Sequence, residues 1–151
     1  MNYTNEITIN LPIEEVIKKF DSAENMKHWQ AGFISLEPIT EKQGEIGSKA
    51  KLKYKMDKRE MELIETITHK NLPKEFHVTY ETKGIFNDQE NYFEEVDTNT
   101  TKWISKTEFK FSGFMMKLMG LLMPNAFKKQ SYKYMIDFKN FVEKGISVAD
   151  A

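Results

Sequence analysis

Residues 49–56 read Lys-Ala-Lys-Leu-Lys-Tyr-Lys-Met, with lysine at every second position. In an extended chain successive side chains point to opposite faces, so the four lysines share one face. Ala50, Leu52, Tyr54 and Met56 share the other face. Such a strand is typical of an antiparallel sheet that has one solvated face and one packed face.

The next residues extend this strand into a hairpin. Asp57-Lys58 suits a two-residue turn, which fixes the pairing of the two strands that it joins. The expected pairs are Met56 with Arg59, Tyr54 with Met61, Leu52 with Leu63, and Ala50 with Glu65. This register places the Glu65 carboxylate on the apolar face. In the alternative register, a one-residue bulge turns Glu65 to solvent and brings Ile64 inward.

Alternation with a period of two continues from residue 33 to residue 112 and predicts about six strands, preceded by a strand over residues 3–9. The last strand, about residues 101–112, places Trp103 and Phe109 on the packed face. Turn residues divide the strands. The expected turns are Asp57-Lys58, Asn71-Leu72-Pro73, Gly84, Asn87-Asp88 and Asp97-Thr98-Asn99.

Helical spacing appears at both ends of the chain. Pro12 suits a first helical position, and the helix that it begins is expected to end at about Phe20. Asp21 or Ser22 is a candidate cap for a second short helix through about Trp29. Helical spacing returns from residue 114 to about residue 144 with a long apolar stripe. The stripe consists of Phe127, Ser131, Tyr134, Met135, Phe138, Phe141 and Val142.

Composition narrows the classes of function. The 151 residues suit one domain over 1–151, and a net charge of −1 argues against a nucleic-acid partner. The chain has no cysteine, no HExxH pattern and no close histidine pair, so we expect neither a metal nor a cofactor. No apolar run is long enough to cross a bilayer. Residues 1–10 lack the features of a signal peptide, and we expect a cytoplasmic protein.

Three segments resemble the START/Bet v 1-like superfamily, also called the helix-grip or SRPBCC superfamily. Residues 9–16 (INLPIEEV) are similar to its entry into the first helix, and residues 21–29 (DSAENMKHW) to its second short helix. Residues 108–113 (EFKFSG) are similar to its last strand before the closing helix. The resemblance is greatest to bacterial polyketide cyclase/dehydrase and lipid-transport proteins. It implies an α+β fold in which a curved antiparallel sheet of about seven strands wraps around a long C-terminal helix.

The resemblance also implies a cavity between sheet and helix that holds an apolar or amphipathic small molecule such as a lipid, a polyketide or an aromatic compound. Binding is the favoured function. The first alternative is a cyclase, dehydratase or hydrolase that uses Glu65 with Tyr54 or a pocket water as acid and base. The second alternative is a protein-interaction module of the chaperone-activator kind. The predicted ligand contacts are Leu52, Tyr54, Met61, Leu63, Glu65, Trp103, Phe109, Met115, Met119, Phe127 and Tyr134.

Two further expectations, one about the methionines and one about a mobile segment, also have simpler explanations. Methionines 115, 116, 119, 123 and 135 suit a surface that adapts to varied ligands, but ordinary core packing explains them more simply. Gly113, Gly120 and Pro124 weaken the helical pattern and predict a mobile gate over residues 113–124. The same three residues also suit a simple turn from sheet to helix.

Overall fold

A computed structural model describes residues 1–114, 116–118 and 124–150 of the chain. Six of the twelve residues of the predicted gate over 113–124, Met115 and Met119 among them, lie outside these ranges. The strands are β1 (Asn2–Ile9), β2 (Phe33–Pro38), β3 (Lys49–Met56), β4 (Arg59–Asn71), β5 (Glu75–Thr82), β6 (Ile85–Asp97) and β7 (Thr100–Phe111). The helices are α1 (Ile13–Phe20), α2 (Met26–Trp29), α4 (Pro124–Lys144) and the short 3-10 helices η1 (Ala23–Asn25) and η2 (Val148–Asp150).

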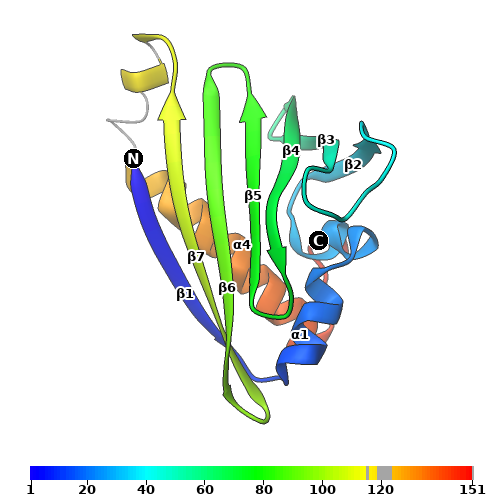
Figure 1. Cartoon of the computed structure of the whole chain (residues 1–151). Helices are drawn as coiled ribbons and strands as arrows, with labels where there is room; N and C mark the ends of the chain where they lie inside the picture. Colours follow the sequence, from blue (N-terminus) through cyan, green and yellow to red (C-terminus); the bar gives the residue numbers. More distant parts are fainter. Residues whose placement is uncertain (115, 119–123, 151) are drawn as a thin grey trace.

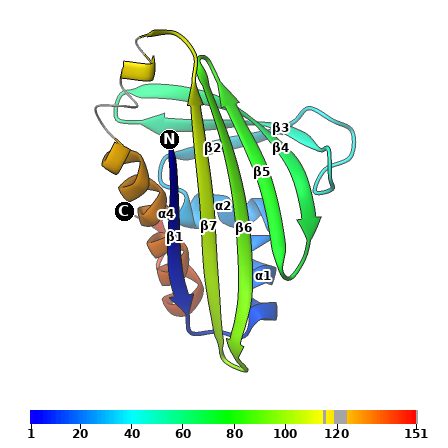
Figure 2. The same ribbon diagram turned by 60° about the vertical axis from the view of Figure 1, so that its left-hand side comes forward.

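The strands form one antiparallel sheet in the order β1-β7-β6-β5-β4-β3-β2. Figure 1 shows α4 crossing behind the long strands, and Figure 2 shows the sheet curving around the side on which the helices lie. In Figure 2, β2 and β3 run across the direction of β1 and β7. The predicted α+β helix-grip architecture is therefore confirmed, including the short helices after the first strand.

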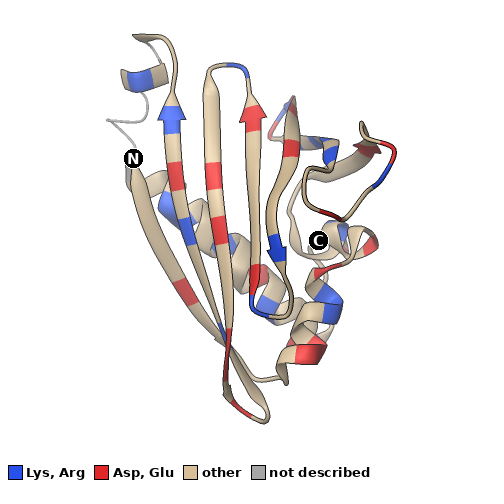
Figure 3. Ribbon diagram, in the orientation of Figure 1, with Lys and Arg blue, Asp and Glu red and all other residues tan. Residues whose placement is uncertain are grey.

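The β3–β4 hairpin has the register that the alternating lysines and the two-residue turn predicted. Ala50 pairs with Glu65, Leu52 with Leu63, and Tyr54 with Met61. On the outer face, Lys53 Nζ lies 3.7 Å from a Glu62 carboxylate oxygen and 3.9 Å from Glu37. Acidic and basic residues are interspersed along the strands in Figure 3. The lysine row is thus a solvated, partly paired face.

Two local predictions were wrong. Asn87-Asp88 is not a turn but lies inside β6, because the chain already reverses at Gly84 and the Asn87 amide donates to the Glu108 carbonyl of β7 at 3.2 Å. Ser22 precedes η1 in extended conformation, but its side chain makes no capping hydrogen bond. The Asp21 N–H instead donates to the Ile17 carbonyl and ends α1.

An aromatic core joins β1, β6 and β7 to the helices. Trp103, Phe93 and Phe138 are each at most 3% exposed, and the Phe20 ring packs against all three at centroid distances of 5.0 to 5.8 Å. The Trp103 indole N–H donates to the Asn91 side-chain oxygen at 2.9 Å, which satisfies a donor that burial would otherwise leave unpaired. Trp103 is therefore a core anchor in the structure.

Polar contacts tie α4 to the edge strand β1. The Tyr3 hydroxyl meets Ser131 and the Phe127 carbonyl, and the Asn5 amide donates to the Lys128 carbonyl at 3.2 Å. Farther along the helix, Lys139 Nζ donates to the Thr8 carbonyl at 2.6 Å. The helix is thus held along β1 and α2. In the described part of the chain, no helix combines the length and apolarity that crossing a membrane requires.

Candidate functional site

Glu65 lies on the inner face of the sheet, between two neighbouring strands. It pairs with Ala50 of β3, which is 2% exposed, and with Tyr80 of β5. Leu52, on the same face as Ala50, is fully buried. The register fixes these neighbours because residues that pair across antiparallel strands project to the same side.

A second apolar cluster surrounds Glu65, separate from the aromatic core. Met26, Leu52 and Tyr54 form its centre, and Phe33, Leu36, Leu63 and Tyr80 pack against them. The Tyr54 hydroxyl donates to the Gln30 side-chain oxygen at the end of α2. The chain therefore folds a single carboxylate into a wall of aliphatic and aromatic side chains.

Burial changes the acid–base behaviour of Glu65. It raises the pKa of Glu65 from the ordinary value of 4.5 to about 7, although a hydrogen bond from Tyr80 partly opposes the rise. Burial also raises the pKa values of Tyr54 and Tyr80, and the nearby Glu65 and Tyr134 raise them further. Both phenols stay protonated at neutral pH, whereas Glu65 exchanges its proton near neutrality.

A band of polar side chains lies on the inner face of the sheet, and sequence reasoning missed its members on β1 and β6. Asn91, Ser105 and Thr107 are each at most 4% exposed, and Asn87 and Asn5 are nearly as buried. The alternation of β6 gave no signal, since Asn87, Gln89 and Asn91 face inward while Asp88 and Glu90, also polar, face outward. The inner face of the sheet is thus amphipathic.

The predicted contact residues divide into three groups in the structure. Leu52, Tyr54, Leu63 and Glu65 lie together, and Tyr134 is close enough to influence the Tyr54 and Tyr80 hydroxyls. Phe109 packs on Phe127 at 5.0 Å between ring centroids, at the other end of β7 from Trp103. Met61, near the β3–β4 turn, lines a surface groove of about 610 Å³ with residues of β4 and β5.

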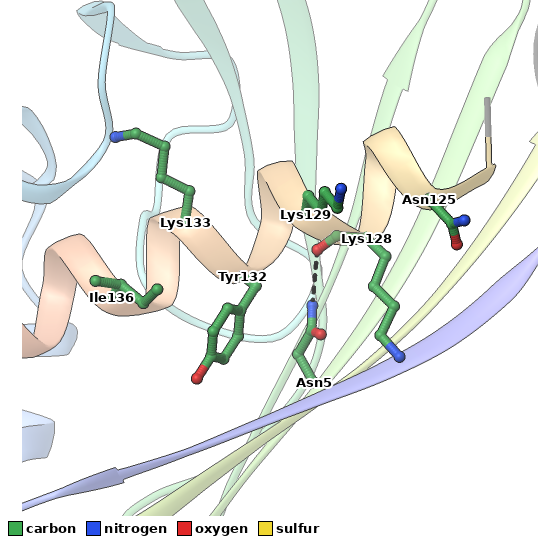
Figure 4. Close-up of a pocket in the computed structure, with 7 residues that line it drawn as sticks. All are labelled: Asn5, Asn125, Lys128, Lys129, Tyr132, Lys133 and Ile136. Carbon is green, nitrogen blue, oxygen red and sulfur yellow. Dashed lines mark hydrogen bonds between the residues drawn. The ribbon is translucent and has the colours of Figure 1, made fainter.

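A second surface groove of about 340 Å³ lies between α4 and β1. In Figure 4, Tyr132 and Lys128 extend from the helix toward β1, and Asn5 reaches back to the helix. Its lining residues are Asn5, Asn125, Lys128, Lys129, Tyr132, Lys133 and Ile136. None of them belongs to the Glu65 cluster or to the predicted ligand contacts.

The histidines make a contact that their spacing in sequence did not indicate. His69 and His77 pair across β4 and β5 with ring centroids 5.0 Å apart, and His69 Nε2 lies 2.9 Å from a Glu75 carboxylate oxygen. This pair depends on strand register and so escapes a search for local motifs. Over the described ranges, no three His, Cys, Asp or Glu side chains form a group that could hold a metal ion.

Solved structures share this architecture over nearly the whole chain. The structure of Ara h 8.0201 matches with a TM-score of 0.73 at 14% identity, over 94% of this chain and 97% of that one. A conserved protein from Geobacillus kaustophilus matches with a TM-score of 0.76 at 17% identity, over 96% of this chain and 97% of that one. A norcoclaurine synthase mutant from Thalictrum flavum, in complex with a transition-state analogue, matches with a TM-score of 0.70 at 11% identity. The match covers 96% of this chain and 95% of that one.

At the level of sequence, neither the models of protein families nor the curated proteins match the chain. The identities to the solved structures are low, so the similarity concerns the backbone and not a conserved set of site residues. Element order, sheet order and the position of the long helix all agree with it. The chain has the Bet v 1-like helix-grip fold.

Proposed function

We propose that the chain binds an amphipathic small molecule between the inner face of the sheet and α4. The ligand's polar end lies at Glu65 and Tyr80. Its apolar part lies along Leu52, Leu63 and the Phe109–Phe127 pair. The likeness to Ara h 8.0201 supports the proposal through the fold, because folds of this kind typically hold hydrophobic ligands in a cavity.

Glu65 is the observation that carries the proposal. Glu65 faces inward opposite the buried Ala50, yet Glu65 and Tyr80 both retain part of their accessible surface. A side chain that is deeply enclosed but still accessible faces a hollow rather than packed atoms. We infer such a hollow beside Glu65. A carboxyl group enclosed without a partner lowers the stability of the folded protein. Its presence there suits a site that binds the polar group of a ligand.

A fluorescence titration with N-phenylnaphthylamine, a neutral apolar probe, tests the proposal. We expect saturable binding with one site per chain. Leu63→Gln should weaken binding about tenfold or more, because it replaces a half-buried apolar contact by an amide. Glu62→Gln, on the outer face of the same strand, is the matched control and should leave affinity unchanged. Absence of saturable binding, or equal affinity in both variants, would contradict the proposal.

Acid–base catalysis in the same site is the second candidate. The specific observation is that Glu65, with a pKa of about 7, receives a hydrogen bond from Tyr80. A group that titrates near neutral pH is suited to give and take a proton. The partner expected from sequence was Tyr54 or a pocket water, and the Tyr54 hydroxyl is engaged by Gln30. Turnover of a bound compound that is lost in Glu65→Gln while binding persists would favour this candidate.

A further inference from the structure

Two phenols, those of Tyr54 and Tyr80, lie in the cluster around Glu65, and a third, that of Tyr134, packs against the aromatic core. Tyr54 comes from β3, Tyr80 from β5 and Tyr134 from α4, and these are the titratable groups that interact with Glu65 or with one another. Among the described residues, no lysine, arginine or histidine shifts the pKa of Glu65, Tyr54 or Tyr80. The neighbours on the same face of β4 are the aliphatic Leu63 and Ile67.

The residues around Glu65 would bind anionic, neutral and cationic ligands with different affinities. An anionic ligand would place a second negative charge beside Glu65, and the cluster has no cation to offset it. A neutral ligand would leave the ionised carboxylate as costly as it is in the empty site. A cationic ligand would offset the carboxylate, and aromatic rings such as those of Tyr54, Tyr80 and Phe33 attract cations through their π faces.

We propose that the ligand is a cationic amphiphile, an apolar ring or chain that carries a protonated amine, and that the amine pairs with the Glu65 carboxylate inside the tyrosine cluster. This inference rests on the proposed function and names the ligand class for the same site. Tyr80 donates to the carboxylate and helps to orient it. The aliphatic side chains of Leu52 and Leu63 receive the apolar part.

Three matched probes test the ligand class: naphthylethylammonium, naphthylethanol and naphthylpropanoate. Calorimetric titrations at pH 5.5 and pH 8 compare them, because the amine stays protonated at both values while Glu65 changes from mostly neutral to mostly ionised. The amine should bind about tenfold tighter at pH 8, since only the ionised carboxylate pairs with it. The alcohol should bind equally at both values, and the propanoate should weaken as pH rises.

Glu65→Gln separates charge pairing from general apolar binding. The variant should lose the pH dependence of amine binding and reduce amine affinity to that of the alcohol, while alcohol binding stays unchanged. Glu62→Gln, exposed on the outer face, is the matched control and should behave as the unmodified protein.

The outcomes also separate the two proposals. The cationic ligand is overturned if the alcohol binds but the amine binds no tighter at pH 8 than at pH 5.5. It is also overturned if the propanoate binds tightest of the three. In both cases the proposed function still stands. If none of the three probes binds, the proposed function falls and the inference falls with it. Tighter amine binding at pH 8 that disappears in Glu65→Gln supports both.

Discussion

Phe138→Ala is expected to lower the free energy of unfolding by about 3 to 5 kcal/mol, the usual cost of removing a fully buried phenylalanine. Phe138 is 0% exposed and packs against the rings of Phe20, Trp29 and Trp103. Through these contacts, one side chain of α4 joins the sheet to α1 and α2. Its loss would leave a cavity where three elements meet.

Urea unfolding followed by circular dichroism measures this effect. Ile136→Ala is the matched control, because Ile136 lies on the same helix and is 37% exposed. It should change stability by no more than about 1 kcal/mol. Similar losses in the two variants would show that α4 is not anchored through Phe138, and the packing described for the aromatic core would be incorrect.

Glu65→Gln is expected to stabilise the empty protein, and to do so more strongly at high pH. The carboxyl group has a pKa of about 7 in the folded protein and an ordinary value of 4.5 when solvated. The folded state therefore binds its proton more tightly, and the stability that Glu65 contributes below pH 4.5 is lost as pH rises to about 7. Since one pKa unit corresponds to about 1.4 kcal/mol, the variant should gain about 2 to 3 kcal/mol more at pH 8 than at pH 5.

Denaturant unfolding of both proteins at the two pH values gives this difference directly. Glu62→Gln controls for the loss of a negative charge, because its ion pairs with Lys51 and Lys53 are long and exposed and contribute little. A gain that is the same at pH 5 and pH 8 would mean that the Glu65 carboxyl is solvated in the folded protein. The proposed polar end of the site would then be lost.

The register of the β3–β4 hairpin could be predicted from sequence because two local signals agreed. Alternating lysines fixed the face of each residue on β3, and Asp57-Lys58 fixed the length of the turn. Together they placed Glu65 opposite Ala50 without any knowledge of the remaining strands. The closing helix was predictable for a similar reason, since its apolar stripe repeats at helical spacing.

The rest of the candidate site could not be predicted, because it depends on contacts between distant segments. Tyr80 meets Glu65 only through the pairing of β4 with β5, which includes an irregularity between Ile67 and His69. Tyr134 arrives from α4, far along the chain. The inward row on β6 was hidden because both faces of that strand carry polar residues, and Asn87-Asp88 has the composition of a turn.

Backbone amide chemical shifts, recorded while N-phenylnaphthylamine is added, test the central claim of an internal site at Glu65 most directly. The account predicts that the largest changes fall on residues of the Glu65 cluster, at Leu52, Leu63, Glu65 and Tyr80, and that they saturate at one probe per chain. Changes confined to the surface groove at Lys129, Tyr132 and Ile136, with the Glu65 cluster unperturbed, would contradict it.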